Sequence, residues 1–178
     1  MHGIKMREER YSAKVTELTT VRDRRRIIGR PFKLSTMHAR ALEPGAPAQP
    51  LHVDVKRGAD GWPLVGFILM VDEFHTENGA TRFVSGSHWL SRELDELTKD
   101  AAEACEGQVL ACGPAGSIIV FNGSVWHGHT ANRSVGRRRS IQGAFIPREA
   151  RSAIDQASRI LPDTFQRIGD LAKYVLDV

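Results

Sequence analysis

The chain has 178 residues, of which 41% are hydrophobic and 26% are charged, and its formal net charge is +4. This composition predicts one globular domain with a buried core and excludes a disordered or repetitive chain. The only two cysteines, Cys105 and Cys112, exclude a disulfide framework or a zinc knuckle, and a reducing cytoplasm fits best. The longest apolar runs are too short to span a membrane, and no apolar signal region stands near the N-terminus. We therefore expect a soluble cytoplasmic protein without a membrane partner.

Positive charge gathers in two arginine-rich clusters, at residues 22–30 and 133–139. Such clusters could neutralise phosphates, which releases counterions and favours nucleic-acid binding. However, no helix-turn-helix, zinc-finger or aromatic RNA-binding motif accompanies them in the sequence. Exposed charge is most often a solvated surface, so we expect no nucleic-acid partner.

The first residues of the chain are polar and compatible with a helix. Val15, Leu18 and Val21 recur at three-residue spacings, so residues 1–30 are predicted to be a lead-in that is mainly helical. A strand is expected over residues 31–43, and the prolines and glycine that follow it can continue neither a helix nor a sheet. Further runs of β type, several of them separated by Gly, Asp and Asn turn signals, follow at residues 51–56, 64–71, 81–84, 108–110, 117–121, 125–130 and 138–147.

Two helical patterns accompany these strands. One covers residues 90–105, with leucines on one face and acidic residues on the other, and the second covers residues 150–178 with a break at Pro162. Many short strands with few helices favour a mainly β fold, a double-stranded β-helix (jelly roll, cupin-like) with flanking helices. We therefore expect a single domain with its β core at residues 31–147.

The first candidate metal ligands are His52 and Asp54. In a strand, the period of two residues points both side chains to one face, while Val53 and Val55 point to the other. Two histidines and a carboxylate on one triangular face leave three positions of Fe(II) open for a chelating co-substrate and O₂. A His-x-Asp pair also occurs by chance, so this interpretation requires a third ligand from elsewhere in the chain.

Two histidines late in the β core could supply that third ligand. His127 and His129 follow an apolar strand and a tight turn at Asn122-Gly123. Strand alternation puts both histidines on the same face, so the spacing does not choose between them.

An arginine run opens the last predicted strand. Arg138 and Ser140 are two residues apart, so they would present a guanidinium and a hydroxyl on one face. This pair suits the distal carboxylate of a dicarboxylic co-substrate, because guanidinium binds carboxylate with charge-assisted hydrogen bonds.

Several segments occur together in a fixed order between Phe32 and Pro147. They are Gln49-Pro50-Leu51-His52-Val53-Asp54, Val71-Asp72-Glu73, Glu77-Asn78-Gly79, Val84-Ser85-Gly86-Ser87-His88, Pro114-Ala115-Gly116-Ser117, Trp126-His127 with Asn132, and the arginine run. In this order they resemble the phytanoyl-CoA dioxygenase (PhyH-like) family of Fe(II)/2-oxoglutarate-dependent oxygenases. One departure is Ser85, which stands where the family usually has proline.

The resemblance implies a role for each candidate ligand. His52 and Asp54 would be the proximal iron ligands and His127 the distal one, which makes His129 the less favoured choice. Arg138, assisted by Ser140, would bind the distal carboxylate of 2-oxoglutarate. The neighbouring Arg137 and Arg139 would then point away from the pocket, and His88 would be structural.

Some further residues carry two interpretations each. Gln49 and Asn132 are candidates for contact with the ligands or the co-substrate, and equally for stabilising a loop. Phe67 and Trp126 could line the pocket or belong to the core. Lys33 and Arg40, in the strand before the first candidate ligands, could touch an acidic substrate.

The activity that the resemblance implies is hydroxylation of a C–H bond in a small-molecule substrate, with release of succinate and CO₂. Fe(II), 2-oxoglutarate and O₂ would be required, with ascorbate as a candidate reductant. Related halogenases lack the carboxylate that Asp54 provides, so hydroxylation is favoured over halogenation. Family members are commonly longer, and a homodimer in which a second subunit covers the exposed sheet is kept as an alternative.

Two rival functions use the same residues differently. A cupin-like metalloenzyme that is independent of a keto acid would keep the three metal ligands and would not need Arg138. A non-catalytic jelly-roll binding module would keep the ligands only as relics of the fold. The observation that separates these alternatives is whether the metal ligands and Arg138 face one shared cavity.

Overall fold

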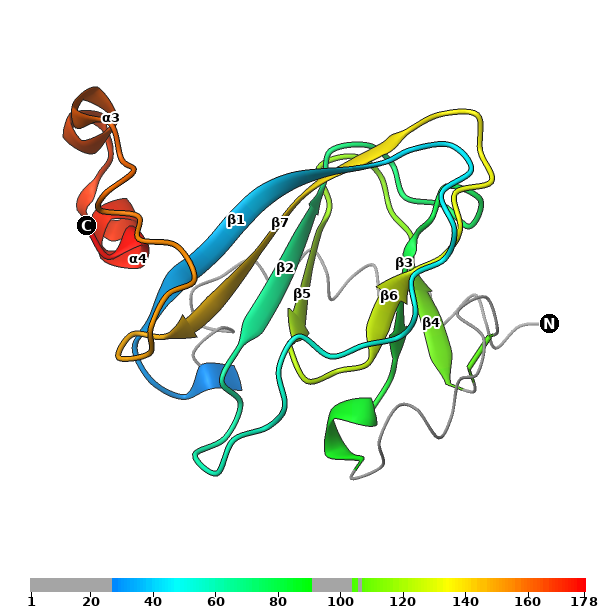
Figure 1. The fold of residues 1–178 in the computed structure, drawn as a ribbon, viewed down its shortest axis with the longest axis horizontal. Helices are drawn as coiled ribbons and strands as arrows, with labels where there is room; N and C mark the ends of the chain where they lie inside the picture. Colours follow the sequence, from blue (N-terminus) through cyan, green and yellow to red (C-terminus); the bar gives the residue numbers. More distant parts are fainter. Residues whose placement is uncertain (1–26, 91–103, 106) are drawn as a thin grey trace.

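The computed structural model of the chain describes residues 27–90, 104–105 and 107–178 (Figure 1). The predicted lead-in helix and most of the helix predicted at residues 90–105 lie outside these ranges. Within the described residues, none of the helices has the length and apolar character that crossing a membrane requires.

Two antiparallel sheets form the body of the protein. The larger sheet has the order β1-β7-β2-β5, with β1 at Phe32–Leu42, β7 at Arg138–Pro147, β2 at Val65–Met70 and β5 at Ile118–Asn122. The smaller sheet has the order β4-β3-β6, with β4 at Gln108–Ala111, β3 at Thr81–Val84 and β6 at His127–His129. The chain passes from one sheet to the other after β2, β4, β5 and β6, and the prediction of a mainly β jelly roll is confirmed.

The alternation of side chains along the strands builds two layers of core. Ile68 and Met70 of β2 point between the sheets, where they pack in a buried cluster with Phe83 of the smaller sheet. Val65 of the same strand points to the opposite face, where it packs with Phe145 and with residues of the C-terminal helix α4. Figure 1 shows α4 beside the start of β1. The inner face of the larger sheet therefore packs against the smaller sheet, and its outer face packs against residues that include those of α4.

The predicted strand at residues 51–56 is wrong. Only His52 pairs there, through an isolated antiparallel bridge to His127 of β6. The backbone N–H groups of Asp54 and Val55 both donate to the carbonyl of Gly123, at 2.9 and 3.2 Å, instead of continuing a ladder. The chain therefore turns away from β6 directly after the first ligand, which brings Asp54 round towards His127.

The C-terminal region contains less helix than predicted. Two short helices are present, α3 at Pro162–Arg167 and α4 at Asp170–Leu176, and residues 150–161 form bends and turns. Pro162 starts α3 rather than interrupting a longer helix, because proline lacks the N–H that a helix interior needs and is tolerated in the first turn. The break at Pro162 was predicted, but the helix before it was not formed.

Candidate metal centre

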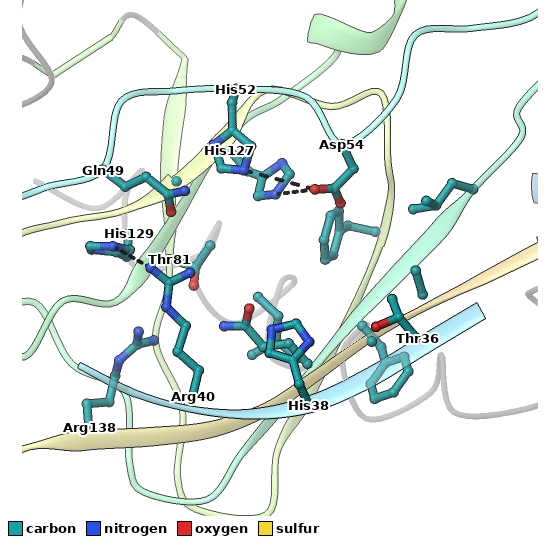
Figure 2. Close-up of a pocket in the computed structure, with 18 residues that line it drawn as sticks. Thr36, His38, Arg40, Gln49, His52, Asp54, Thr81, His127, His129 and Arg138 are labelled. Atoms are coloured by element: carbon teal, nitrogen blue, oxygen red, sulfur yellow. Dashed lines mark hydrogen bonds and ion pairs between the residues drawn. The ribbon is translucent and has the colours of Figure 1, made fainter. Parts of the chain in front are cut away.

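Three side chains with metal-ligand chemistry meet between the two sheets. His52, Asp54 and His127 each offer a ligand atom, and these atoms lie within 4.8 Å of one another. Oδ1 of Asp54 is 3.7 Å from Nε2 of His127 and 4.0 Å from Nε2 of His52 (Figure 2). His127 is buried, whereas about a third of each of the other two side chains is exposed. The group therefore has one anchored ligand and two that a solute can reach.

Backbone carbonyls fix which nitrogen of each histidine carries the proton. Nδ1 of His127 lies 2.9 Å from the carbonyl oxygen of Val125, and Nδ1 of His52 lies 3.2 Å from that of Pro50. A carbonyl oxygen can only accept, so Nδ1 carries the hydrogen in both rings and Nε2 presents a lone pair. Burial also lowers the pKa of His127, which favours the neutral ring. In each ring Nε2 is therefore the nitrogen that is left to bind a metal.

His129 has other partners. Its Nδ1 is 3.0 Å from the carbonyl oxygen of Thr130, and its Nε2 accepts a hydrogen bond from Nη2 of Arg40 at 3.1 Å. The lone pair that a metal would need is therefore already used. Burial lowers the pKa of His129, and the positive charges of Arg40 and Arg138 lower it further, which favours the neutral ring. Of the two histidines that the spacing left open, the structure brings only His127 into the metal-ligand group.

The metal-ligand group lines one end of a cavity of about 320 Å³, and Arg138 lines the same cavity. In Figure 2, Arg40, Arg138, Gln49 and His129 gather on one side of the cavity, away from Thr36. Strand register explains this arrangement, because Leu42 and Arg138 pair near one end of β1, and Thr36 pairs with Ala144 nearer the other end. The cavity is therefore cationic at one end.

Arg138 is buried with 1% of its surface exposed. Its guanidinium carbon lies 4.0 Å from the centre of the Phe74 ring, and its Nε and Nη1 have no hydrogen-bond partner among the described residues. Burial, and then repulsion from Arg40, lowers its pKa to about 10, so it still carries its charge at neutral pH. A buried charged donor without a hydrogen-bond partner is costly, so these two nitrogen atoms would gain from a bound acceptor.

The neighbours of Arg138 point where the sequence predicted. Arg139 lies on the surface, and its side chain donates two hydrogen bonds to Asp72, of 2.7 and 3.0 Å, which lowers the pKa of that carboxyl. Arg137 is also exposed and lies 3.7 Å from Glu43. Ser140 shares the buried face of Arg138, but its hydroxyl accepts a hydrogen bond from Gln142, which lines the cavity in its place.

Gln49 and Asn132, which the sequence could not assign, are placed differently. Gln49 lines the cavity near His129. Asn132 is buried outside it, where its amide group donates to the carbonyls of Leu42 and Gly136 at 3.0 and 2.9 Å. Its side-chain oxygen accepts from the backbone and the hydroxyl of Ser134. The contacts of Asn132 are therefore those of an amide that stabilises a loop.

Arg40 and Lys33, the two basic residues considered for an acidic substrate, lie in different surroundings. Arg40 points into the cavity, whereas Lys33 is bonded to Asp177 of the C-terminal region at 3.0 Å. Lys33 precedes a bulge between Leu34 and Thr36, which changes the face on which later residues of β1 lie. Sequence reasoning missed His38 and Thr36, which alternate with Arg40 along β1 and line the cavity. The period of two was the signal that could have found them.

Other predicted aromatic residues are mainly structural. The ring of Phe67 packs 5.4 Å from that of Phe145 in the outer cluster, although Phe67 also borders the cavity. Trp126 is buried with Leu51 on the far side of the smaller sheet. His88 packs against Trp62, with ring centres 5.2 Å apart, and burial lowers its pKa.

Residues 7–140 match the model of the family described as phytanoyl-CoA dioxygenase (PhyH). The chain belongs to the phytanoyl-CoA dioxygenase family. The resemblance seen in the sequence is thereby confirmed, and it covers both the metal-ligand group and Arg138.

Relatives with curated names are fungal dioxygenases. Dioxygenase cdmA of Talaromyces verruculosus is 35% identical over 108 residues, which are 56% of this chain and 35% of the relative. Dioxygenase andF of Emericella variicolor is 35% identical over 115 residues, which are 60% of this chain and 38% of the relative. The chain thus matches little more than a third of the length of these family members.

Solved structures show the same fold. EvdMO1 has a TM-score of 0.58 at 22% identity, covering 75% of this chain and 32% of that one. HygX from Streptomyces hygroscopicus, solved with nickel and 2-oxoglutarate bound, has a TM-score of 0.62 at 12% identity, covering 80% of this chain and 66% of that one. These likenesses agree with the jelly-roll fold of this family member.

Proposed function

We propose that this chain is an Fe(II)- and 2-oxoglutarate-dependent dioxygenase that hydroxylates a C–H bond of a small molecule. The observation that carries this proposal is the shared cavity. His52, Asp54 and His127 line it together with Arg138, whose buried guanidinium has two nitrogen atoms without a partner in the described part of the chain. The names of the fungal relatives and the 2-oxoglutarate bound to HygX support the same chemistry.

The three ligand residues fit a divalent iron ion. They supply two neutral imidazole nitrogens and one carboxylate, which is the donor set of non-haem iron oxygenases with open coordination positions. The protons held on Nδ1 of His52 and His127 leave both Nε2 atoms free to bind. The rings of Phe121 and Phe83 lie 4.7 and 5.7 Å from that of His127 and limit its rotation.

The cationic end of the cavity fits the far carboxylate of a keto acid. Arg138 would bind it, because the unpaired Nε and Nη1 atoms would then gain charge-assisted hydrogen bonds. Arg40, Gln49 and Thr81 line the cavity between Arg138 and the metal ligands and offer further donors to the same co-substrate. We propose no contact to the co-substrate for Asn132, and only an indirect one for Ser140, through Gln142.

Iron and 2-oxoglutarate, when bound, would activate O₂ to oxidise a substrate C–H bond, with succinate and CO₂ as co-products. The protein's contribution is to place the reactants. Arg138 would orient the keto acid, and the ligand group would fix the metal. Thr36 and Ala144, which pair across β1 and β7, line the cavity away from the Leu42–Arg138 pair, and with Leu64 and Phe121 they would receive the substrate.

The rival functions account less well for these observations. A metalloenzyme independent of a keto acid has no use for a buried arginine in the same cavity. A non-catalytic relic has no reason to keep both histidines in the tautomer that binds metal. Arg138 is what distinguishes the proposal from both rivals.

The proposal is tested by mixing the protein with Fe(II) and 2-oxoglutarate without oxygen and recording the visible charge-transfer absorption of the chelate. The wild-type protein should give the band. His52→Ala should abolish it, and Arg138→Ala should require far more 2-oxoglutarate to produce it, because the co-substrate loses its buried counter-charge.

Arg139→Ala is the matched control for Arg138→Ala. Arg139 is the next residue along the same strand but points to solvent and holds Asp72. Its removal should leave the 2-oxoglutarate titration unchanged. Iron binding by the wild-type protein without any band would support the keto-acid-independent enzyme, and absence of iron binding would support the non-catalytic module.

A further inference from the structure

A second buried arginine, Arg82, lies on the opposite face of the smaller sheet from the cavity. Along β3, Thr81 lines the cavity and Phe83 packs in the inner cluster, so Arg82 between them points outward. Only 2% of its surface is exposed. Val84, two residues further on, belongs to the buried cluster on this outer face. Arg82 is therefore a charged side chain enclosed behind the metal-ligand group.

The guanidinium of Arg82 joins two segments. Its Nη2 donates to the backbone carbonyl of Gln49 at 3.0 Å, and its Nη1 donates to the side-chain oxygen of Gln108 on β4 at 3.4 Å. The shorter bond thus reaches the segment that carries the first metal ligands, three residues before His52.

The segment from Gln49 to His52 runs alongside β6 (Figure 1). The N–H of Gln49 donates to the carbonyl of His129 at 2.9 Å, and His52 exchanges two hydrogen bonds with His127. Only these three backbone hydrogen bonds are described between the Gln49–His52 segment and β6, because the chain leaves β6 directly after His52. Arg82 adds a contact to this short pairing from outside the sheet.

Gly128 has no side chain, which leaves space for the Arg82 side chain to cross β6 and reach Gln49. It pairs directly with Arg82 across β3 and β6, and it stands between Arg82 and the Gln49 carbonyl. A Cβ atom at Gly128 would lie 3.0 Å from the carbonyl oxygens of both Gln49 and Pro50. A side chain there would therefore push on the same two carbonyls and crowd the arginine that crosses over.

Taking a charged side chain out of water is costly, whereas an apolar residue of similar size carries no such cost. The directional bond to the Gln49 carbonyl is what an apolar residue could not supply.

We propose that Arg82 is a positioning residue for the metal centre, which acts by holding the Gln49 carbonyl and so fixing the segment that presents His52 and Asp54. The effect on metal binding rests on the proposed function, whereas the effect on the segment does not. Arg82 acts through the Gln49 carbonyl, so its contribution is to the placement of the ligands and of Gln49.

The test compares Arg82→Met with Arg82→Lys and with Lys33→Met. Lys33 is the matched control, because it is also a buried cation with a long-range partner but lies at β1, on Asp177. Titration with Co(II) should show binding about tenfold weaker in Arg82→Met, as is typical for loss of a group that orients ligands. Arg82→Lys should recover part of the loss, since lysine keeps one charged donor. Lys33→Met should bind Co(II) as the wild-type protein does.

Amide hydrogen exchange on the metal-free proteins gives an independent readout. The N–H groups of Gln49 and His52 should exchange faster in Arg82→Met than in the wild-type protein, while those of β2 stay protected. If Arg82→Met does not fold, Arg82→Lys and Gly128→Ala are measured in its place and should show the same local change. Wild-type protein that binds no Co(II) would refute the proposed function, and the exchange data would still decide the role of Arg82. Exchange and Co(II) affinity that match those of Lys33→Met would overturn the proposal.

Discussion

Nη2 of Arg40 lies 3.1 Å from Nε2 of His129, and this hydrogen bond uses the lone pair that would make His129 a metal ligand. His127, two residues earlier on the same face of β6, keeps its Nε2 directed at Asp54. One contact from the far sheet thus distinguishes two histidines that are equivalent in the sequence.

Replacing each histidine in turn tests this distinction. His127→Ala should weaken Fe(II) binding by more than about 100-fold, because loss of a ligand should exceed the effect of losing a group that only supports one. His129→Ala should leave iron binding nearly unchanged. Anaerobic titration with Fe(II) measures both affinities, and equal losses in the two variants would contradict the assignment.

Arg138 should destabilise the ligand-free protein. Its buried Nε and Nη1 lack partners in the described residues, so Arg138→Met should raise the free energy of unfolding by about 1–3 kcal/mol, with methionine packing on Phe74. Thermal unfolding of the two ligand-free proteins measures this difference.

The same pair of proteins separates stability from co-substrate binding. With metal present throughout, 2-oxoglutarate at a concentration that just saturates the wild-type protein should raise its Tm, because a ligand that binds only the folded state stabilises it. The same concentration should raise the Tm of Arg138→Met far less. A variant that is less stable than the wild type, or that 2-oxoglutarate stabilises as much as the wild type, would contradict this role of Arg138.

Asn132 should affect stability without affecting co-substrate binding. Asn132→Ala removes four side-chain hydrogen bonds, to Leu42, Gly136 and Ser134, and should lower the free energy of unfolding by about 2–4 kcal/mol. Ser134→Ala is a milder control, which removes only the two hydroxyl contacts of Ser134, to Asn132 and Gly136. Denaturant unfolding gives the stabilities, and a weaker affinity of Asn132→Ala for 2-oxoglutarate would restore this residue to the binding site.

The stability of the metal-free protein should fall on acidification. Burial lowers the pKa values of His127 and His129 below the ordinary value of about 6.5, so in acid the unfolded chain takes up protons that the folded protein excludes. Their full contribution is present above about pH 6.5 and is lost as the pH falls below it. The lowered pKa of Asp72 acts near pH 4 and lower, outside this window.

Urea unfolding between about pH 8 and pH 5 measures this dependence. The free energy of unfolding should decrease towards pH 5, and His129→Gln should flatten the decrease, because glutamine cannot take up the proton. A stability that stays constant through this range would mean that the two histidines titrate normally in the folded protein.

The sequence by itself determined the fold class and named the candidate metal ligands. Strand periodicity depends on local alternation, so it placed most strands of the two sheets within one or two residues. The His-x-Asp pair and the later histidines could be named because metal ligands are a small set of residue types.

The tertiary structure decided what depends on contacts between distant segments. The preference for His127 over His129 as the candidate ligand depends on the contact of Arg40 from the other sheet. Whether Gln49 and Asn132 line the cavity depends on where two loops lie in the folded chain. The strand predicted at 51–56 failed because Asp54 bonds to Gly123 rather than to β6, and no local pattern encodes that partner. Periodicity predicts the face of a strand on which a side chain lies, whereas only the folded chain determines which residues contact that face.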